Sequence, residues 1–285
     1  NIEDMLRNFQ KKEKMLFAHK QREAVIEAML NGVTVITGGP GTGKTTIINC
    51  IIRLMEQQGM TVVLAAPTGR AAKRMAETTG REAKTIHRLL EYSYGENGPY
   101  FQKNEDNPIL ADAIIIDEMS MVDVLLMNNL LKAIIPGTRL VLVGDVDQLP
   151  SVGPGNVLRD IISSGIIKVV YLTEIFRQAQ ESMIVLNAHR INQGHMPYLN
   201  IKGGDFFFDK REKPDVILDT MFDLICRRLP GFGSYDPMKD MQVLSPMRKG
   251  AIGVNNLNVE LQRILNPPSG QKREKTLRGI LFREG

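Results

Sequence analysis

Cysteine is scarce in this sequence of 285 residues, which contains only Cys50 and Cys226. Neither belongs to a C-x-x-C pair or a Cys/His spacing, so the sequence supports neither a disulfide framework nor a zinc site. We therefore predict a reduced, cytoplasmic location. Apolar runs are short: none approaches the roughly 20 residues that a membrane-spanning helix needs, and no membrane partner is expected. The chain begins at Asn1 without Met or a signal-peptide pattern, which suggests a cut boundary.

A large excess of charge of one sign is also lacking. The 36 basic and 32 acidic residues give a net charge of only +4, which does not by itself indicate a nucleic-acid partner. The charge is unevenly distributed, because residues 68–90 carry six cations against Glu77 and Glu82. The six cations are Arg70, Lys73, Arg74, Arg81, Lys84 and Arg88. The length and the hydrophobic content of 43% predict a globular chain with more than one domain.

The glycine-rich stretch at 38–46 contains the most specific motif. An apolar, β-branched run precedes it at 33–37, and an apolar, helix-like segment follows it at 47–55. The stretch fits the phosphate-binding pattern G-x-x-x-x-G-K-[ST] through Gly38, Gly43, Lys44 and Thr45. Glycine lets the backbone curl so that N–H groups face a phosphate, Lys44 reaches the β- and γ-phosphates, and Thr45 ligands Mg²⁺. The expected nucleotide contacts are Gly39, Pro40, Gly41, Thr42, Gly43, Lys44, Thr45 and Thr46.

Short apolar runs and helix-like segments alternate after this loop. Further strands are expected at 61–66, 113–116, 139–143 and 167–172, and helices at 69–79, 85–91, 121–133 and 155–163. Uniformly apolar strands that alternate with helices predict an α/β fold, with a parallel sheet covered by helices on both faces. One long helix is expected at 3–30. A turn-rich excursion near 91–108 predicts a hairpin, whose aromatic side chains either stack on bases or pack against one another.

The last third of the sequence begins after a helix expected at 181–194. The glycines at 203 and 204 indicate a linker and a domain boundary. Beyond it we expect strands at 206–208 and 241–244 and helices at 215–229 and 252–265. Residues 271–285 are polar and basic, and no complete element is predicted there.

Two carboxylates follow the apolar run at 113–116, at the strand end where α/β sheets bind ligands. Asp117 is expected to hold Mg²⁺ together with Thr45. Glu118 is the natural general base for a water that attacks the γ-phosphate. The alternative is a surface Asp-Glu pair that begins a helix, which the three preceding isoleucines disfavour.

Two further polar residues follow later strands. Gln148 is placed to sense or polarise the γ-phosphate, although a glutamine in a turn means little by itself. Arg177 is a candidate for stabilising transition-state charge, and the alternative is an ordinary surface arginine.

Taken together, these residues resemble the RecD-like, 5′→3′ branch of the superfamily 1 DNA helicases over residues 16–268. Motifs I, II, III and IV correspond to residues 38–46, 117–121, 144–150 and 172–178, which makes Arg177 the arginine finger. Residues 19–25 resemble the adenine-reading Q motif, with Gln21 as the reader. Residues 244–250 resemble the opening of a second RecA-like domain, with Arg248 as a nucleotide contact.

The resemblance also implies a DNA-binding face. Residues 66–72 resemble motif Ia, and 85–90 resemble the segment that follows it. The DNA contacts so implied are Pro67, Thr68, Gly69, Arg70 and His87. Without the resemblance, Arg81, Lys84 and Arg88 are a solvated helix face, and His87 is as plausibly a structural histidine.

The fold that the resemblance implies is a RecA-like P-loop NTPase domain followed by the start of a second one. The predicted domains are an N-terminal helical segment at 1–30, a first RecA-like domain at 31–202 and a truncated second domain at 205–285. No segment resembles motifs V and VI, so the chain is expected to be a fragment.

The implied activity is that of an ATP-dependent DNA helicase in recombination or repair, with ATP and Mg²⁺ as cofactors. The expected partners are single-stranded DNA and other subunits of a recombination nuclease-helicase complex. The alternatives are a helicase domain of a conjugative relaxase, a P-loop kinase or GTPase-like switch, and a subunit that binds ATP only for assembly. The guanine-reading loop or arginine-rich lid of the kinase or switch is absent from the sequence.

Overall fold

The computed structural model describes residues 1–95, 98–174 and 181–285. The chain divides into two compact units, residues 1–207 and 208–285, and each is described by itself. In the described part, no helix is long and apolar enough to cross a bilayer.

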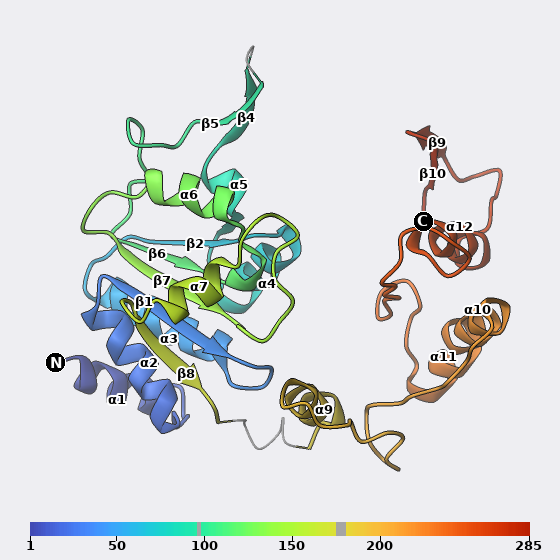
Figure 1. The fold of residues 1–285 in the computed structure, drawn as a ribbon, viewed down its shortest axis with the longest axis horizontal. Coiled ribbons are helices and arrows are strands. Elements are labelled where there is room, and N and C mark those ends of the chain that lie inside the picture. The colour runs from blue at the N-terminus through green and yellow to red at the C-terminus, as the bar shows by residue number, and fades with distance from the viewer. Residues whose placement is uncertain (96–97, 175–180) are drawn as a thin grey trace. The chain divides into compact units, whose positions relative to one another are not determined.

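The first unit is built on a parallel sheet of six strands in the order β3-β2-β6-β7-β1-β8 (Figure 1). The strands are β1 (Val33–Gly38), β2 (Val62–Ala66), β3 (Ala83–Thr85), β6 (Ala113–Ile116), β7 (Arg139–Gly144) and β8 (Lys168–Leu172). Strands β6, β7 and β1 are adjacent and almost wholly buried, as their continuous apolar runs require. The predicted α/β fold is confirmed. Strand β3 was not predicted, because three residues carry too little periodicity.

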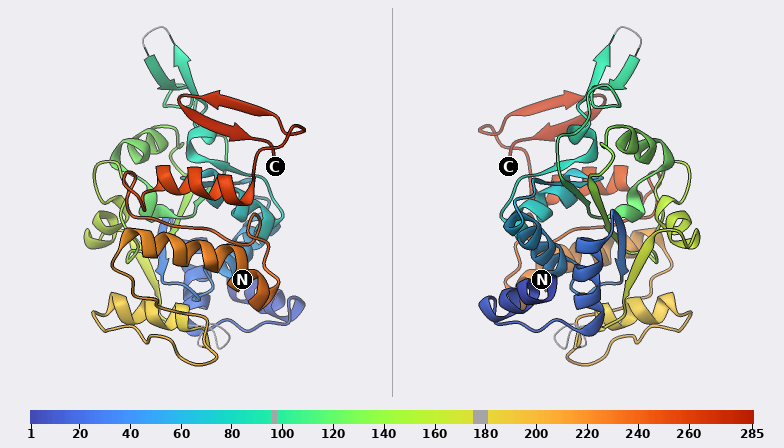
Figure 2. Two further views of the ribbon diagram at one scale, coloured as in Figure 1. Left: turned by 90° about the vertical axis from the view of Figure 1, so that its right-hand side faces the viewer. Right: turned by 90° about the vertical axis from the view of Figure 1, so that its left-hand side faces the viewer.

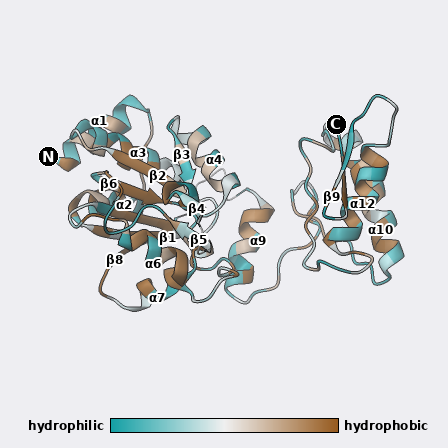
Figure 3. Ribbon diagram, turned by 90° about the horizontal axis from the view of Figure 1, so that it is seen from above, coloured by the Kyte–Doolittle hydropathy of each residue, from teal (hydrophilic) through white to brown (hydrophobic). Residues whose placement is uncertain are grey.

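Helices cover both faces of this sheet. One face packs against α1 (Ile2–Lys12), α2 (His19–Leu30) and α3 (Lys44–Gln57). The helices on the other face are α5 (Ile86–Leu89), α6 (Val124–Lys132) and α7 (Val157–Ser163). Figure 3 shows the apolar strands in brown, with helices of mixed polarity around them. The remaining helices of the unit's described residues are α4 (Gly69–Thr79), α9 (Met183–Asn192) and the short 3₁₀ helix η1 (Met119–Met121).

The prediction of one helix over residues 3–30 was wrong, because two helices occupy this region. The backbone of Lys14 is left-handed, with φ of 51°, and ends the first helix. Phe17 then packs on Phe9 with ring centroids 6.0 Å apart, and its N–H donates to Gln10 Oε1 at 2.8 Å. The turn therefore interrupts the helix and allows the aromatic side chain of Phe17 to be buried.

A hairpin projects from the first unit in every view (Figure 1, Figure 2). Its strands are β4 (Tyr92–Gly95) and β5 (Gly98–Phe101), and they pair antiparallel. The Tyr92 ring contacts those of Tyr94 and Phe101, with centroids 5.7 and 5.2 Å away. These aromatic residues thus pack against one another.

The second unit contains helices and one hairpin. Its elements are α10 (Pro214–Asp223), a π-helical turn (Leu224–Arg228), α11 (Leu229–Gly233), α12 (Val254–Leu265), β9 (Glu274–Leu277) and β10 (Ile280–Arg283). The hairpin β9–β10 corrects the prediction that residues 271–285 form no complete element. The strands predicted at 206–208 and 241–244 are not formed, because neither segment has a neighbouring strand with which to pair. A second RecA-like domain in this region stays a prediction.

Candidate nucleotide-binding site

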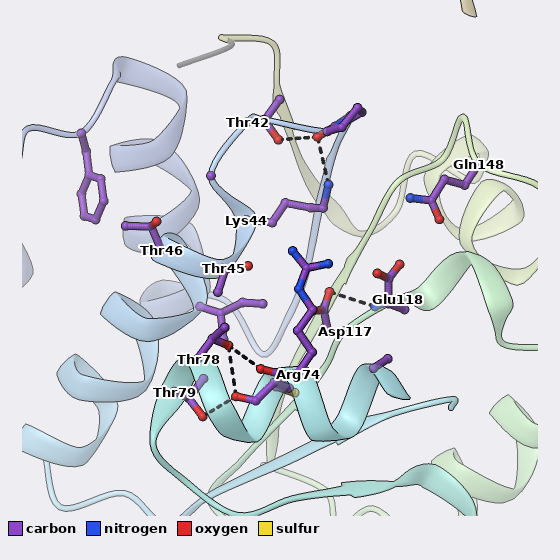
Figure 4. Close-up of a pocket in the computed structure, with 18 of the residues that line it drawn as sticks. Thr42, Lys44, Thr45, Thr46, Arg74, Thr78, Thr79, Asp117, Glu118 and Gln148 are labelled. Atoms are coloured by element: carbon purple, nitrogen blue, oxygen red, sulfur yellow. Dashed lines mark hydrogen bonds between the residues drawn. The ribbon is translucent and has the colours of Figure 1, made fainter. Parts of the chain in front are cut away.

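The site lies where three neighbouring strands end. Asp117 and Glu118 follow β6, the turn that carries Gln148 follows β7, and the glycine-rich loop follows β1. These three strands are neighbours and parallel, so their carboxyl ends bring all of these groups to one edge of the sheet. A cavity of about 590 Å³ opens there, lined by all these groups (Figure 4). The arrangement follows the general rule that open α/β sheets bind ligands at the carboxyl ends of their strands.

The glycine-rich loop has the conformation that phosphate binding requires. Gly41 and Gly43 are left-handed, with φ of 76° and 81°, so a side chain would be strained at either position. Helix α3 begins directly afterwards at Lys44, which points its N-terminus into the cavity. A Cβ on Gly38 would lie 2.8 Å from Leu172 Cβ, so this position admits only glycine. The loop therefore fits a phosphate chain.

Side chains within the loop hold its carbonyls. Lys44 Nζ donates to the carbonyls of Gly38 and Gly39 at 2.6 and 3.0 Å, and Thr42 Oγ1 donates to Gly39 O at 2.8 Å. An ammonium group has three protons, so one donor of Lys44 is left for a phosphate.

Gln21 lies beneath the loop and does not line the cavity. Its side chain is 2% exposed; Nε2 donates to Thr42 O at 2.9 Å, and Oε1 accepts the Ala18 N–H at 3.0 Å. In this structure Gln21 therefore connects the start of α2 to the glycine-rich loop. Its role as a reader of adenine stays a prediction.

The two carboxylates are held in a constrained turn. Asp117 Oδ1 accepts the Glu118 N–H at 2.9 Å, and Glu118 is left-handed with φ of 56°, an uncommon conformation for a residue with a Cβ. Burial raises the pKa of both carboxyls, and the charge of Asp117 raises the pKa of Glu118 further. Burial lowers the pKa of Lys44, which the three nearby carboxylates, led by Asp145, oppose.

Thr45 and Asp117 both line the cavity and offer the oxygen ligands that Mg²⁺ prefers. The described residues contain no cluster of three or more His, Cys, Asp or Glu that would form a metal site from protein groups alone. This suits Mg²⁺, which keeps several waters and is bound through one or two protein groups and substrate phosphates.

Gln148 is exposed at the rim of the cavity and connects two of the motifs. Its Oε1 accepts a hydrogen bond of 3.4 Å from Ser120 Oγ, on the turn that follows Glu118.

The chain is similar to several known proteins. The AAA domain family matches residues 21–154. The ATP-dependent RecD2 DNA helicase of Deinococcus radiodurans is 39% identical over 261 residues, which are 91% of this chain and 34% of that protein. The RecBCD enzyme subunit RecD of Mycolicibacterium smegmatis is 32% identical over 284 residues, covering 88% of this chain and 51% of that protein. This chain belongs to the RecD-like helicase family.

The RecD-like chain thus spans about a third and about half of the length of these two relatives. A solved structure of the Pif1 helicase from Candida albicans is also similar, at 25% identity. The similarity covers 64% of this chain and 45% of that one, with a TM-score of 0.48.

Two residues of the RecD-like site were missed by sequence reasoning. Arg74 on α4 lines the cavity, and Figure 4 shows its guanidinium directed toward Lys44 and Asp117. His189 on α9 places Nε2 3.2 Å from Pro40 O, and a Cβ on Gly39 would lie 2.6 Å from its Cε1. Arg74 shares a helix face with the other cavity-lining residues of α4, a pattern visible in the sequence, whereas His189 has no local signal.

The predicted DNA contacts of the RecD-like chain lie outside the nucleotide cavity. Thr68 caps α4, its Oγ1 accepting the Ala71 N–H at 3.2 Å, and Arg70 is exposed on the first turn. His87 is exposed and its ring contacts Tyr92 and Phe101. Their contact with DNA, like that of Pro67 and Gly69, stays a prediction.

The structure tests neither of the two predicted arginines. Arg177 lies outside the described residues, and Arg248 is exposed in the second unit. Both assignments stay predictions.

Proposed function

We propose that this chain is the ATPase core of a RecD-type helicase that moves 5′→3′ along single-stranded DNA in recombination or repair. One observation supports this most strongly: a single cavity is lined by the glycine-rich loop, Asp117, Glu118 and Gln148. A kinase receives its nucleophile from the second substrate and needs no general base for water, whereas an ATPase does.

Each polar group has a role in the proposed reaction. Lys44 and the loop N–H groups bind the β- and γ-phosphates, while Thr45 and Asp117 would hold Mg²⁺, which neutralises phosphate charge when bound. Glu118 accepts a proton from the attacking water, and Gln148 orients that water at the γ-phosphate. Gln21 and Arg248 are proposed nucleotide contacts, and Arg177 the arginine that stabilises the transition state.

The DNA strand is proposed to cross the first turn of α4. Pro67, Thr68, Gly69, Arg70 and His87 are the proposed contacts to its backbone. The mycobacterial relative is a RecBCD enzyme subunit, which supports the proposal that the parent protein associates with other recombination subunits. A cytoplasmic location is consistent with the two free cysteines of the described residues.

Glu118→Gln tests the chemistry. We expect ATP binding to be kept and DNA-stimulated hydrolysis by the parent protein to fall about 10²- to 10⁴-fold, because a general base is lost. Glu77→Gln is the matched control, since Glu77 is exposed on α4 and does not line the cavity. Normal turnover by Glu118→Gln would show that the base is assigned wrongly.

Residues 1–285 alone are expected to bind nucleotide and to hydrolyse ATP only slowly. The resemblance implies a second arginine from motif VI, and no segment of this sequence resembles that motif. Steady-state ATPase with and without single-stranded DNA measures this, and robust DNA-stimulated turnover would contradict it.

A further inference from the structure

We propose that Arg74 binds the terminal phosphate of ATP and thereby makes the site favour ATP over ADP. The inference rests on the proposed function and adds to it a residue and a specificity. No motif assigned above includes Arg74, because the resemblance to motif Ia ends at Ala72.

The position of Arg74 on α4 directs it into the nucleotide cavity. Ala71, Arg74, Met75 and Thr78 all line the cavity, at the spacing that places residues on one face of a helix. Arg74 extends from this face toward Lys44 and Asp117 (Figure 4). The other described cations of residues 68–90 do not line the cavity.

The charges around Arg74 place it at the terminal-phosphate end. Lys44, Asp117 and Glu118 line the same cavity as Arg74, and the guanidinium extends toward the first two (Figure 4). Lys44 of a phosphate loop reaches the β- and γ-phosphates, and the carboxylates lie where Mg²⁺ and the attacking water are expected. A cation among these groups faces the γ-phosphate rather than the base or ribose.

The guanidinium of Arg74 is available for a ligand. Among the residues that the structure describes, no carboxylate oxygen lies within 4.0 Å of a guanidinium nitrogen of Arg74. Three other cations of the same stretch are paired: Lys73 with Glu77, Arg81 with Glu56 and Lys84 with Glu82. A planar guanidinium can donate two parallel hydrogen bonds to phosphate oxygens, which an ammonium cannot match.

The test is equilibrium binding of Mg²⁺ complexes of a fluorescent, hydrolysis-resistant ATP analogue and of fluorescent ADP to residues 1–285. For Arg74→Ala we expect the affinity for the ATP analogue to fall about 10- to 100-fold, the value of a charge-assisted hydrogen bond to phosphate. The affinity for ADP should change less than about 3-fold. Arg74→Lys keeps the charge but loses the planar pair of donors, so its affinity for the ATP analogue should lie between those of wild type and Arg74→Ala.

Lys73→Ala is the matched control. Lys73 is the preceding residue of the same helix, but its side chain is 79% exposed and does not line the cavity. We expect both affinities to be unchanged, with all variants melting within a few degrees of wild type because both side chains are exposed.

Three results would overturn the inference. An equal loss of affinity for the ATP analogue and for ADP in Arg74→Ala would show that Arg74 does not act on the γ-phosphate. No loss of affinity for either nucleotide would show that Arg74 does not contribute to binding. In both cases wild-type binding leaves the proposed function intact. A wild-type chain that binds neither nucleotide would overturn the proposed function together with the inference.

Discussion

Truncation of Gln21 to alanine tests whether this residue supports the phosphate loop by itself, without nucleotide. The glutamine is buried and both of its polar atoms are engaged within the protein, with Thr42 O and the Ala18 N–H. Gln21→Ala removes both bonds. It leaves the Thr42 carbonyl in a buried position without its donor and the Ala18 N–H without its acceptor.

The magnitude follows from the burial of the two bonds. A buried polar group that loses its partner costs about 1–3 kcal/mol. The bond to Thr42 is buried and counts in full, whereas the bond to Ala18 is partly buried, so water can replace its acceptor. We expect a loss of roughly 2–3 kcal/mol in the free energy of unfolding. For a unit of this size, that corresponds to a fall of about 4–12 °C in Tm.

Thermal unfolding followed by circular dichroism, without added nucleotide, measures this loss. Gln57→Ala is the matched control, because Gln57 is exposed at the end of α3, and its Tm should hardly change. Gln21→Glu keeps an oxygen for the Ala18 N–H but sets a second oxygen against Thr42 O, so it should be destabilised as well. An unchanged Tm for Gln21→Ala, together with weaker nucleotide binding, would refute a supporting role for Gln21. A direct contact with adenine would then be its only role.

Two further predictions concern the loop and the thiols. Gly39→Ala should lower the free energy of unfolding by about 1–2 kcal/mol through the contact with His189, and addition of His189→Ala should recover part of this loss in a double-mutant cycle. Additive effects would show that the contact does not exist. Cys50 is fully buried and burial raises its pKa to about 12, so a thiol reagent at pH 8 should label only Cys226 in the native protein and both cysteines after denaturation. Rapid labelling of both would contradict the packing of α3.

The sheet and the centre of the site could be predicted because their signals are local. The buried runs that end at Gly38 and Ile116 are continuous and β-branched, and the residues that follow them stand at fixed spacings. In a parallel sheet the carboxyl ends of all strands lie at one edge, and this does not depend on the conformation of the connecting loops. Composition and spacing therefore predicted that the glycine-rich loop, Asp117 and Glu118 meet at the cavity.

The rest depends on contacts between positions that are distant in sequence. His189 reaches Pro40 across 149 positions, and no property of either segment predicts the pair. The break after Lys14 depends on the burial of Phe17 against Phe9, which overrides helical periodicity. The segment at 206–208 has the composition of a strand, yet two of its three phenylalanines, Phe207 and Phe208, are 65% and 50% exposed. Without a neighbouring strand, β-propensity alone forms no sheet.

The donors around the glycine-rich loop come from separate elements and have one common effect. Lys44 holds the carbonyl of Gly38, Lys44 and Thr42 hold that of Gly39, His189 contacts that of Pro40, and Gln21 holds that of Thr42. Because a peptide unit is planar and trans, its C=O and N–H point in opposite directions.

Gln21 and His189 do not line the cavity, so their contacts with the carbonyls of residues 42 and 40 turn the N–H groups of Gly43 and Gly41 the other way. The carbonyl of Gly39 is also held, but the nitrogen of the same peptide unit belongs to Pro40, which has no N–H. No donor is therefore lost at this position. Each N–H that is turned in this way belongs to a glycine, where no Cβ hinders the approach of a phosphate. The backbone of the loop is thus held by side chains of α2 and α9 as well as by the motif itself.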